Sequence, residues 1–124
     1  MKITSFDPLI ISPNTEDVIA VFEALGFERA HTKTNVDERG ITAVRLTDPN
    51  GFHVDVSETT KLTRDLTSIR MNVSDFQEAY DLLVSRGFKN AQEDHTVIDS
   101  SSESAMMISP SGFSITIVKH NKKA

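Results

Sequence analysis

The chain has 124 residues, a formal net charge of −5 and no cysteine. This length suffices for one domain with its own core, and the lack of cysteine excludes disulfides and thiolate metal sites. Acidic residues outnumber basic ones, and only the tail from Lys119 to Lys123 is locally basic, which argues against nucleic-acid binding. No apolar run reaches the length of a membrane span and the first residues lack a signal core, so we expect a cytoplasmic protein without a membrane anchor.

Local structure signals recur along the chain at a constant distance. An offset of 61 residues separates three pairs of them: Gly26 and Gly87, the turns that begin at Asp48 and Ser109, and the helix-opening residues Asn14 and Asp75. This repetition predicts two copies of one supersecondary unit, residues 1–60 and 61–124, within a single domain of residues 1–124. Two similar halves commonly pack around a shared cleft, so we expect the functional residues there.

The first half begins with a strand-like stretch, residues 3–11. Residues 12–14, Ser-Pro-Asn, then carry the signals that open a helix. Four apolar residues at helical spacing predict the buried face of this helix: Val18, Val21, Phe22 and Leu25. Gly26 ends the helix, and two further strands are expected at 28–34 and 41–47.

The second half repeats this order of elements after its own first strand. Ser74 and Gln77 have the spacing of a capping box at the start of a helix. The buried face of that helix is predicted from four residues: Phe76, Ala79, Tyr80 and Leu83. Gly87 ends the helix, and strands are expected at 89–97 and 103–108.

Two tight turns are predicted at 48–51 and 109–112, because proline presets φ and glycine accepts a positive φ. The strand after each turn alternates between apolar and polar residues. Phe52, Val54 and Val56 oppose His53, Asp55 and Ser57, and Phe113, Ile115 and Ile117 oppose Ser114, Thr116 and Val118. We expect the aromatic and aliphatic face to pack on the helix and the other face to line the concave side of the sheet.

The predicted class is therefore α+β, with two tandem βαβββ modules that form curved mixed sheets around a cleft. A βαβββ unit with a Pro-x-Gly-aromatic turn before its last strand, present twice, resembles the vicinal oxygen chelate superfamily. This superfamily includes glyoxalase I, bleomycin-resistance proteins, fosfomycin-resistance enzymes and extradiol dioxygenases. The resemblance covers nearly the whole chain, and it implies a homodimer, since members of this fold often pair or exchange halves.

The resemblance also implies where a metal ion would bind. In metal-dependent members each half supplies one ligand from its first strand, usually His, and one from its last strand, usually Glu. The matching positions here are Asp7 and Ser68 in the first strands and Asp55 and Thr116 in the last strands. Two carboxylates and two hydroxyls bind transition-metal ions poorly. An oxygen-rich triad of Asp7, His53 and Asp55, suited to Mn²⁺ or Mg²⁺, is the alternative.

Arg70 lies two residues after Ser68 and is therefore expected on the same face of the sheet, directed into the cleft. It either binds a ligand carboxylate or phosphate, or forms an internal ion pair with Asp7 or Asp55. The sequence favours the ion pair, because two carboxylates are predicted nearby. Asn72 continues the same face and would orient a ligand in either case.

The predicted function is the binding of a small organic molecule in the cleft, without a catalytic metal or other cofactor. The expected ligand-binding residues are Asp7, Leu9, His53, Asp55, Ser68, Arg70, Asn72, Ser114 and Thr116. The alternative is a glyoxalase-type lyase or isomerase with Mn²⁺ or Mg²⁺, in which Asp7 or Asp55 binds the ion or acts as a general base. In a metal-free enzyme His53 would be the base. A third reading is a partner-binding module that holds no ligand.

Overall fold

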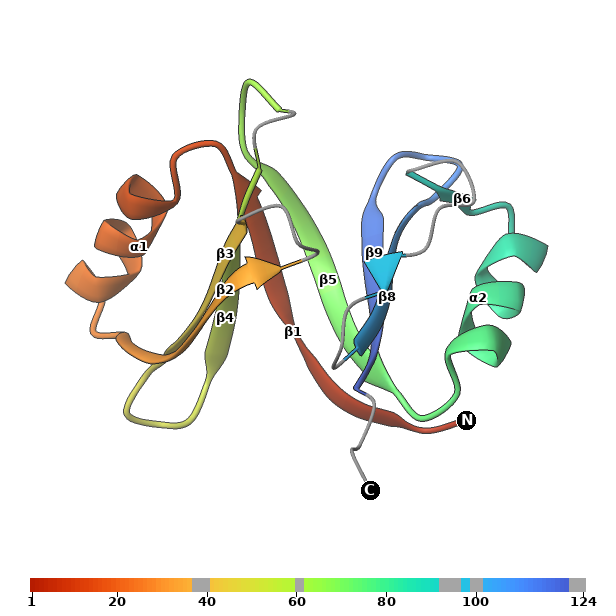
Figure 1. Ribbon diagram of the computed structural model, residues 1–124, viewed down its shortest axis with the longest axis horizontal. Coiled ribbons are helices and arrows are strands. Elements are labelled where there is room, and N and C mark those ends of the chain that lie inside the picture. Colours follow the sequence, from red (N-terminus) through yellow and green to blue (C-terminus); the bar gives the residue numbers. More distant parts are fainter. Residues whose placement is uncertain (37–40, 60–61, 92–96, 99–101, 121–124) are drawn as a thin grey trace. The chain divides into compact units, whose positions relative to one another are not determined.

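The computed structural model describes residues 1–36, 41–59, 62–91, 97–98 and 102–120. The chain divides into two compact units: Asp7–Thr67, here called the first unit, and Met1–Phe6 with Ser68–Ala124, the second unit. Each unit contains one helix and a mixed arrangement of strands (Figure 1), so the predicted α+β class with two βαβββ modules is confirmed. No helix in the described ranges is long and apolar enough to cross a membrane.

The first unit is built from the elements of the first half of the chain. They are β1 (Ile3–Ser12), whose first residues belong to the second unit, α1 (Thr15–Ala24), β2 (Glu28–Val36), β3 (Ile41–Thr47) and β4 (His53–Glu58). The strand order is β2-β3-β4-β1. Strand β1 runs parallel to β4, whereas β2, β3 and β4 are antiparallel neighbours.

The second unit repeats this arrangement with one difference. Its elements are β5 (Leu66–Val73), α2 (Phe76–Ser85), β6 (Lys89–Asn90), β7 (Val97–Ile98), β8 (Ser102–Ile108) and β9 (Ser114–His120). The strand order is β5-β9-β8-β6, with β7 also paired to β8, and β5 runs parallel to β9.

The single strand predicted at 89–97 is wrong, because the structure has the two short strands β6 and β7 in its place. Lys89 pairs with Ile108 and Val97 with Ser104, so the two strands use registers on β8 that differ by four residues. One regular strand cannot hold both registers. The predicted stretch also includes residues 92–96, which lie outside the described ranges.

Both predicted turns are present. Their glycines have φ of +87° and +109°, in the left-handed region that glycine enters without steric cost. In the first turn the Asp48 carboxylate accepts a hydrogen bond from the Phe52 N–H, and in the second the Ser109 hydroxyl accepts one from the Phe113 N–H. In both turns, therefore, the side chain of the first residue accepts a hydrogen bond from the backbone N–H four residues later.

The aromatic residues that follow these turns do not pack beneath the helices. Phe52 and Phe113 are 68% and 52% exposed, so that part of the prediction is wrong. Each of them lies between its turn and the first residue of its strand, outside the alternation of the pleat. Farther along the strands, Val54, Val56 and Ile117 are buried as predicted.

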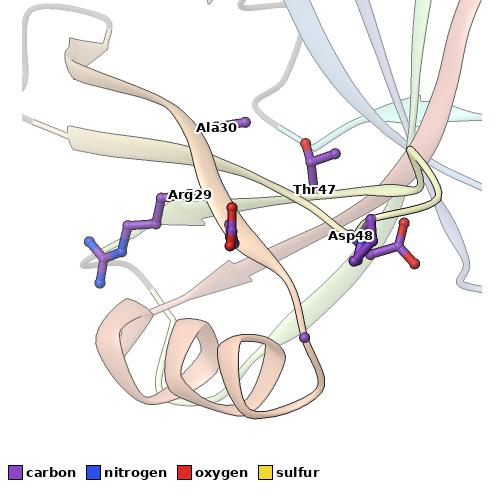
Figure 2. Close-up of a pocket in the computed structure, with 7 residues that line it drawn as sticks. Arg29, Ala30, Thr47 and Asp48 are labelled. Carbon is purple, nitrogen blue, oxygen red and sulfur yellow. The ribbon is translucent and has the colours of Figure 1, made fainter.

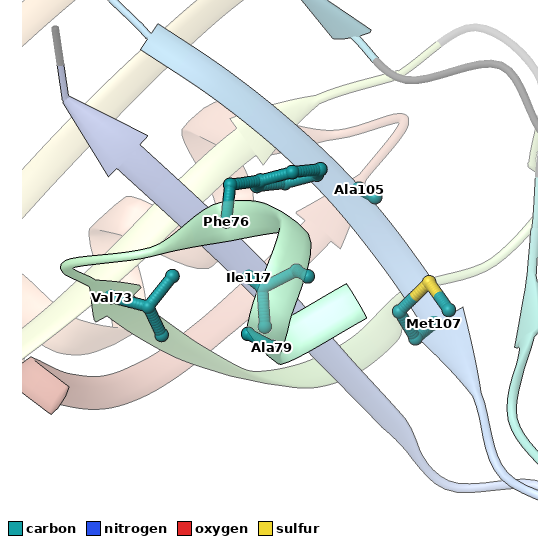
Figure 3. Packing of buried hydrophobic residues seen from close by; sticks show 6 residues of the cluster. All are labelled: Val73, Phe76, Ala79, Ala105, Met107 and Ile117. Carbon is teal, nitrogen blue, oxygen red and sulfur yellow. The ribbon is translucent and has the colours of Figure 1, made fainter. Parts of the chain in front are cut away.

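Each unit has its own hydrophobic core between its helix and its strands. The first core consists of Ile19, Val44, Leu46, Val54 and Val56. The second core (Figure 3) consists of Val73, Phe76, Ala79, Ala105, Met107 and Ile117. Phe76 and Ala79 confirm the predicted face of α2, on which Tyr80 and Leu83 also pack.

The buried face of α1 differs from the prediction. Ile19 is only 1% exposed, whereas Val21 and Leu25 are 58% and 69% exposed. Val18 and Phe22 pack against the core as predicted. Successive residues of a helix are rotated by about 100° around its axis. The large apolar residues from Val18 to Leu25 therefore cover about 160° of the helix circumference, which is wider than one buried stripe. The period alone therefore does not fix which part of that span faces the sheet.

The N-terminus of α2 is capped by Asp75, whose carboxylate accepts a hydrogen bond from the Glu78 N–H at 3.0 Å. The predicted capping box of Ser74 and Gln77 is therefore wrong by one residue. The Ser74 hydroxyl instead accepts a hydrogen bond from the N–H of Lys2. The extended backbone needed at a cap occurs at Asp75, with φ of −136° and ψ of 102°.

We expect Asp75→Ala to lower the free energy of unfolding by about 1 kcal/mol, because the Glu78 N–H loses its acceptor. Asn14→Ala is the matched control, since Asn14 has the equivalent place at α1 but makes no side-chain capping bond. The control is expected to change stability by less than about 0.5 kcal/mol. Urea denaturation followed by circular dichroism measures both values, and equal losses would contradict the role of Asp75.

Candidate functional site

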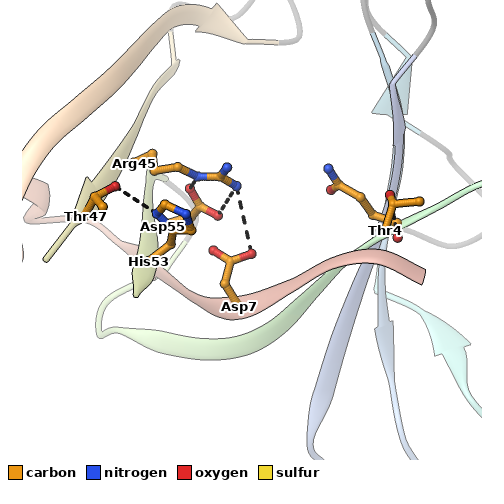
Figure 4. Close-up of polar contacts among 7 residues, drawn as sticks. Thr4, Asp7, Arg45, Thr47, His53 and Asp55 are labelled. Carbon is orange, nitrogen blue, oxygen red and sulfur yellow. Dashed lines mark hydrogen bonds and ion pairs between the residues drawn. The ribbon is translucent and has the colours of Figure 1, made fainter. Parts of the chain in front are cut away.

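A guanidinium group holds two buried carboxylates on the first unit's sheet. Arg45 on β3 lies directly opposite Asp55 on β4. Its Nε donates a hydrogen bond to Asp55 Oδ1 at 3.0 Å and its Nη2 donates one to Oδ2 at 3.1 Å. Asp7 on β1 forms an ion pair with the same Nη2 at 4.0 Å (Figure 4). The result is a two-bond fork between Arg45 and Asp55, with Asp7 beside it.

The pleat explains why these residues share one face. Val44 and Leu46 on β3 and Val54 and Val56 on β4 contribute to the core beneath α1. Successive side chains of a strand point to opposite faces of the sheet. Arg45 and Asp55 therefore lie on the face of the sheet opposite α1. Leu9, which is buried, is the β1 neighbour of Asp55 in the parallel ladder.

The three charged side chains differ in their exposure. The side chains of Asp7 and Asp55 are 6% and 8% exposed, whereas that of Arg45 is 30% exposed. The hydrogen bonds to Asp55 raise the pKa of Arg45 above its ordinary value against the opposing effect of burial, and the negative charges of Asp55 and Asp7 act in the same upward direction. Arg45 is therefore a permanent cation at the accessible edge of this group.

His53 is also exposed and lies near this group. It is opposite Thr47 in the β3–β4 ladder, two residues from the Arg45–Asp55 pair on each strand. Its Nδ1 lies 2.8 Å from the Thr47 hydroxyl oxygen, which fixes the ring orientation (Figure 4).

The equivalent positions of the second unit carry hydroxyl groups. Ser68 on β5 lies 2.7 Å from the hydroxyl oxygens of both Ser114 and Thr116 on β9. All three residues are buried. The hydroxyls therefore hydrogen-bond to one another within the unit, and their burial leaves little of their surface for a ligand to contact.

Arg70 and Asn72 are half-buried on β5, opposite Thr116 and Val118 of β9. The side-chain oxygen of Asn72 is buried and accepts no hydrogen bond from the part of the chain that the structure describes. The predicted ion pair of Arg70 with Asp7 or Asp55 would join residues of different units and stays a prediction. The arginine that holds both carboxylates within the first unit is Arg45.

Sequence reasoning missed Arg45, although a signal for it was present. The turn after Asp48 closes a hairpin, and Arg45 and Asp55 lie at equal distances from its centre. Placing the two strands in register around this turn would have paired them. The repeat did not indicate a functional role for Arg45, because the corresponding residue in the second half is Met106.

The residues present do not fit a resident metal ion of the kind that the resemblance implies. Among the described residues, no group of three or more His, Asp or Glu side chains is arranged to hold an ion. The predicted triad of Asp7, His53 and Asp55 is therefore not arranged as a metal site. Both oxygens of Asp55 accept hydrogen bonds from Arg45. The neutral hydroxyls of Ser68 and Thr116 are weak ligands compared with thiolate, imidazole or carboxylate.

A polar pocket of about 350 Å³ lies elsewhere in the first unit, between the start of β2 and the turn after β3 (Figure 2). It is lined by Gly26, Glu28, Arg29, Ala30, Thr47, Asp48 and Pro49. Arg29 forms ion pairs with Glu16 and Glu23 of α1 at 3.2 and 3.7 Å. None of the predicted site residues lines this pocket.

Several solved structures have a similar fold. A glyoxalase/bleomycin resistance protein/dioxygenase superfamily member from Vibrio splendidus 12B01 is 15% identical, with a TM-score of 0.61, over 95% of this chain and 99% of that one. Methylmalonyl-CoA epimerase from Mycobacterium tuberculosis is 17% identical, with a TM-score of 0.67, over 97% and 90% of the two chains. Methylmalonyl-CoA epimerase in complex with methylmalonyl-CoA and NH4+ is 18% identical, with a TM-score of 0.65, over 95% of each chain.

These similarities confirm that the fold is that of the vicinal oxygen chelate proteins. No protein-family model and no curated protein matches the chain. At such low identity the fold alone is shared, and function has to be argued from the residues of the site.

Proposed function

We propose that this chain binds a small organic molecule on the face of the first unit's sheet that carries Arg45, Asp55 and Asp7, without a catalytic metal ion. The observation that carries the proposal is the fork between Arg45 and Asp55. Asp55 occupies the position from which, by resemblance, metal-dependent members of the fold supply a carboxylate ligand. Here that carboxylate is engaged by an arginine.

The chemistry of the fork supports this proposal. A divalent ion at Asp55 would have to displace the guanidinium or be bound next to its positive charge, and both cost free energy. Arg45 combines a permanent charge with partial exposure. Exposed His53 lies two residues from Asp55 on β4, and buried Leu9 is the β1 neighbour of Asp55. A few polar groups with an apolar neighbour are typical of sites for small organic ligands.

A lyase or isomerase is the second candidate, and one observation favours it. Several of the solved structures with this fold are methylmalonyl-CoA epimerases, some of them in complex with CoA compounds. In such an enzyme Asp7 or Asp55 would bind a metal ion or remove a proton. The fork opposes this reading, because it occupies both oxygens of Asp55.

Metal content after exposure to Ni²⁺, Zn²⁺, Mn²⁺, Fe²⁺ and Mg²⁺ and exhaustive dialysis distinguishes the two candidates. We expect elemental mass spectrometry of the tag-free protein to find far less than one ion per chain. Asp55→Ala is the control, and it should give the same low value. Near-stoichiometric retention that is lost in Asp55→Ala would contradict the proposal and favour the metal-dependent enzyme.

A further inference from the structure

We infer that the polar pocket at the start of β2 is a second ligand site, and that it takes a small organic cation such as a primary amine. The pocket has a volume of about 350 Å³ and lies within the first unit (Figure 2). That volume is at the lower end of the range for ligand pockets, so the ligand is a small one. The lining includes neither Arg45 nor the carboxylates that Arg45 holds, so the inference goes beyond the proposed function.

The second unit shows the same place of the fold closed. Gly87 and Pro110 correspond to Gly26 and Pro49 of the pocket in the repeat. A Cβ atom added to Gly87 would lie 2.9 Å from Pro110 Cγ, so the turn closes against the end of α2. A Cβ atom added to Gly26 would have no atom of the described residues within 4 Å. The first unit therefore leaves open a space that the second unit fills.

The aromatic residues beside these positions differ in the same way. In the second unit the rings of Phe88 and Phe113 pack edge to face, with their centroids 5.5 Å apart. Their counterparts are Phe27, which packs on Phe22 of α1 at 5.4 Å, and Phe52, which is 68% exposed. In the first unit, therefore, this aromatic contact does not hold the turn against the start of β2.

A β-bulge in β2 also contributes to the pocket. From Arg29 to His31 strand β2 advances by two residues, whereas β3 advances by one. The extra residue is Ala30, which lines the pocket. In the second unit the Ala91 N–H donates a hydrogen bond to the Met106 carbonyl, in step with the β6–β8 pairs before it. The bulge therefore belongs to the open pocket, and bulges are common next to functional sites.

The charges of the lining select a cation. Glu28 is exposed and has no hydrogen bond or ion pair within the described part of the chain. Asp48 accepts both hydrogen bonds of its turn at Oδ1, so its Oδ2 remains for a ligand. Arg29 also lines the pocket, but it is bound to Glu16 and Glu23 of α1 and points away from Asp48 (Figure 2).

An ammonium group suits these carboxylates better than an anion or a metal ion does. Its N–H groups make charge-assisted hydrogen bonds to carboxylate oxygens, whereas an anion would be repelled. A metal ion would need further ligands, and in the described ranges no group of three or more His, Asp or Glu is arranged to hold one. In the second unit Lys89 and Ser109 replace Glu28 and Asp48, so the closed place lacks both carboxylates.

Three-carbon compounds that differ only in their end groups test the inference: 1,3-diaminopropane, 1,3-propanediol and malonate. Each is titrated at physiological salt, which screens non-specific attraction, while NMR follows the backbone N–H signals of Gly26, Ala30 and Asp48. We expect the diamine to shift these signals and the other two compounds to leave them in place. Glu28→Gln should weaken diamine binding by about tenfold, because it removes a charged acceptor. Glu103→Gln on β8 is the matched control and should leave the affinity unchanged.

The double variant Glu28→Lys, Asp48→Ser separates binding from folding. It carries the residues of the second unit, where the Ser109 hydroxyl closes the turn, so it should fold and bind no diamine. Circular dichroism checks its fold, and if it does not fold, Glu28→Gln at an exposed position decides.

Four results would overturn the inference: no diamine binding to the wild type, unchanged binding to the folded double variant, tighter binding of the diol or malonate, or an equal loss in Glu103→Gln. The face of the sheet that carries Arg45 is unchanged in these variants. Such results would therefore leave the proposed function standing.

Discussion

Arg45→Met is expected to lower the free energy of unfolding by about 3 kcal/mol, because removal of one partner from a buried ion pair takes away interactions that offset the desolvation of the other charge. Asp55 would lose both hydrogen bonds of the fork, and Asp7 would lose the cation 4.0 Å away. Methionine is chosen because it is the residue at the equivalent place in the second half. Urea denaturation followed by circular dichroism gives the difference.

The triple variant Asp7→Ser, Arg45→Met, Asp55→Thr is the control for this loss. Its residues are those found together in the second unit, where Ser68 and Thr116 are hydrogen-bonded and Met106 lies opposite Thr116. We expect it to recover most of the stability, to within about 1 kcal/mol of the wild type, because the two buried carboxylates are removed together with Arg45. A triple variant as unstable as Arg45→Met would show that the loss comes from the packing of Arg45 and not from its charge.

The sequence predicted part of this site. Resemblance to a family led to Asp7 and Asp55, and the alternation of β4 placed His53 on the face of Asp55. The resemblance and the repeat do not point to Arg45, because it pairs with Asp55 from the neighbouring strand. A residue at a cross-strand position is found only when the register of the hairpin is worked out, and the turn after Asp48 supplied that register.

The fold was predicted more completely than the site. The repeat, both proline-glycine turns and the apolar face of α2 have short-range causes that can be read from the chain, and the structure confirms them. The strand at 89–97 and the capping box at Ser74 failed for another reason. The register on β8 and the backbone angles at Asp75 depend on neighbours that are distant in sequence, and local patterns do not contain them.

Helix α1 allows this difference between local pattern and tertiary packing to be measured. Ile19→Ala is expected to lower the free energy of unfolding by about 3 kcal/mol, because Ile19 is 1% exposed and packs against four buried residues of β3 and β4. Leu25→Ala, at a position that is 69% exposed, is the matched control and should cost less than about 0.5 kcal/mol. Urea denaturation of the two variants decides which face of α1 is buried. A larger loss of unfolding free energy in Leu25→Ala than in Ile19→Ala would support the buried face predicted from helical spacing alone. A larger loss in Ile19→Ala would show that packing against the sheet decides which part of the wider apolar surface is buried.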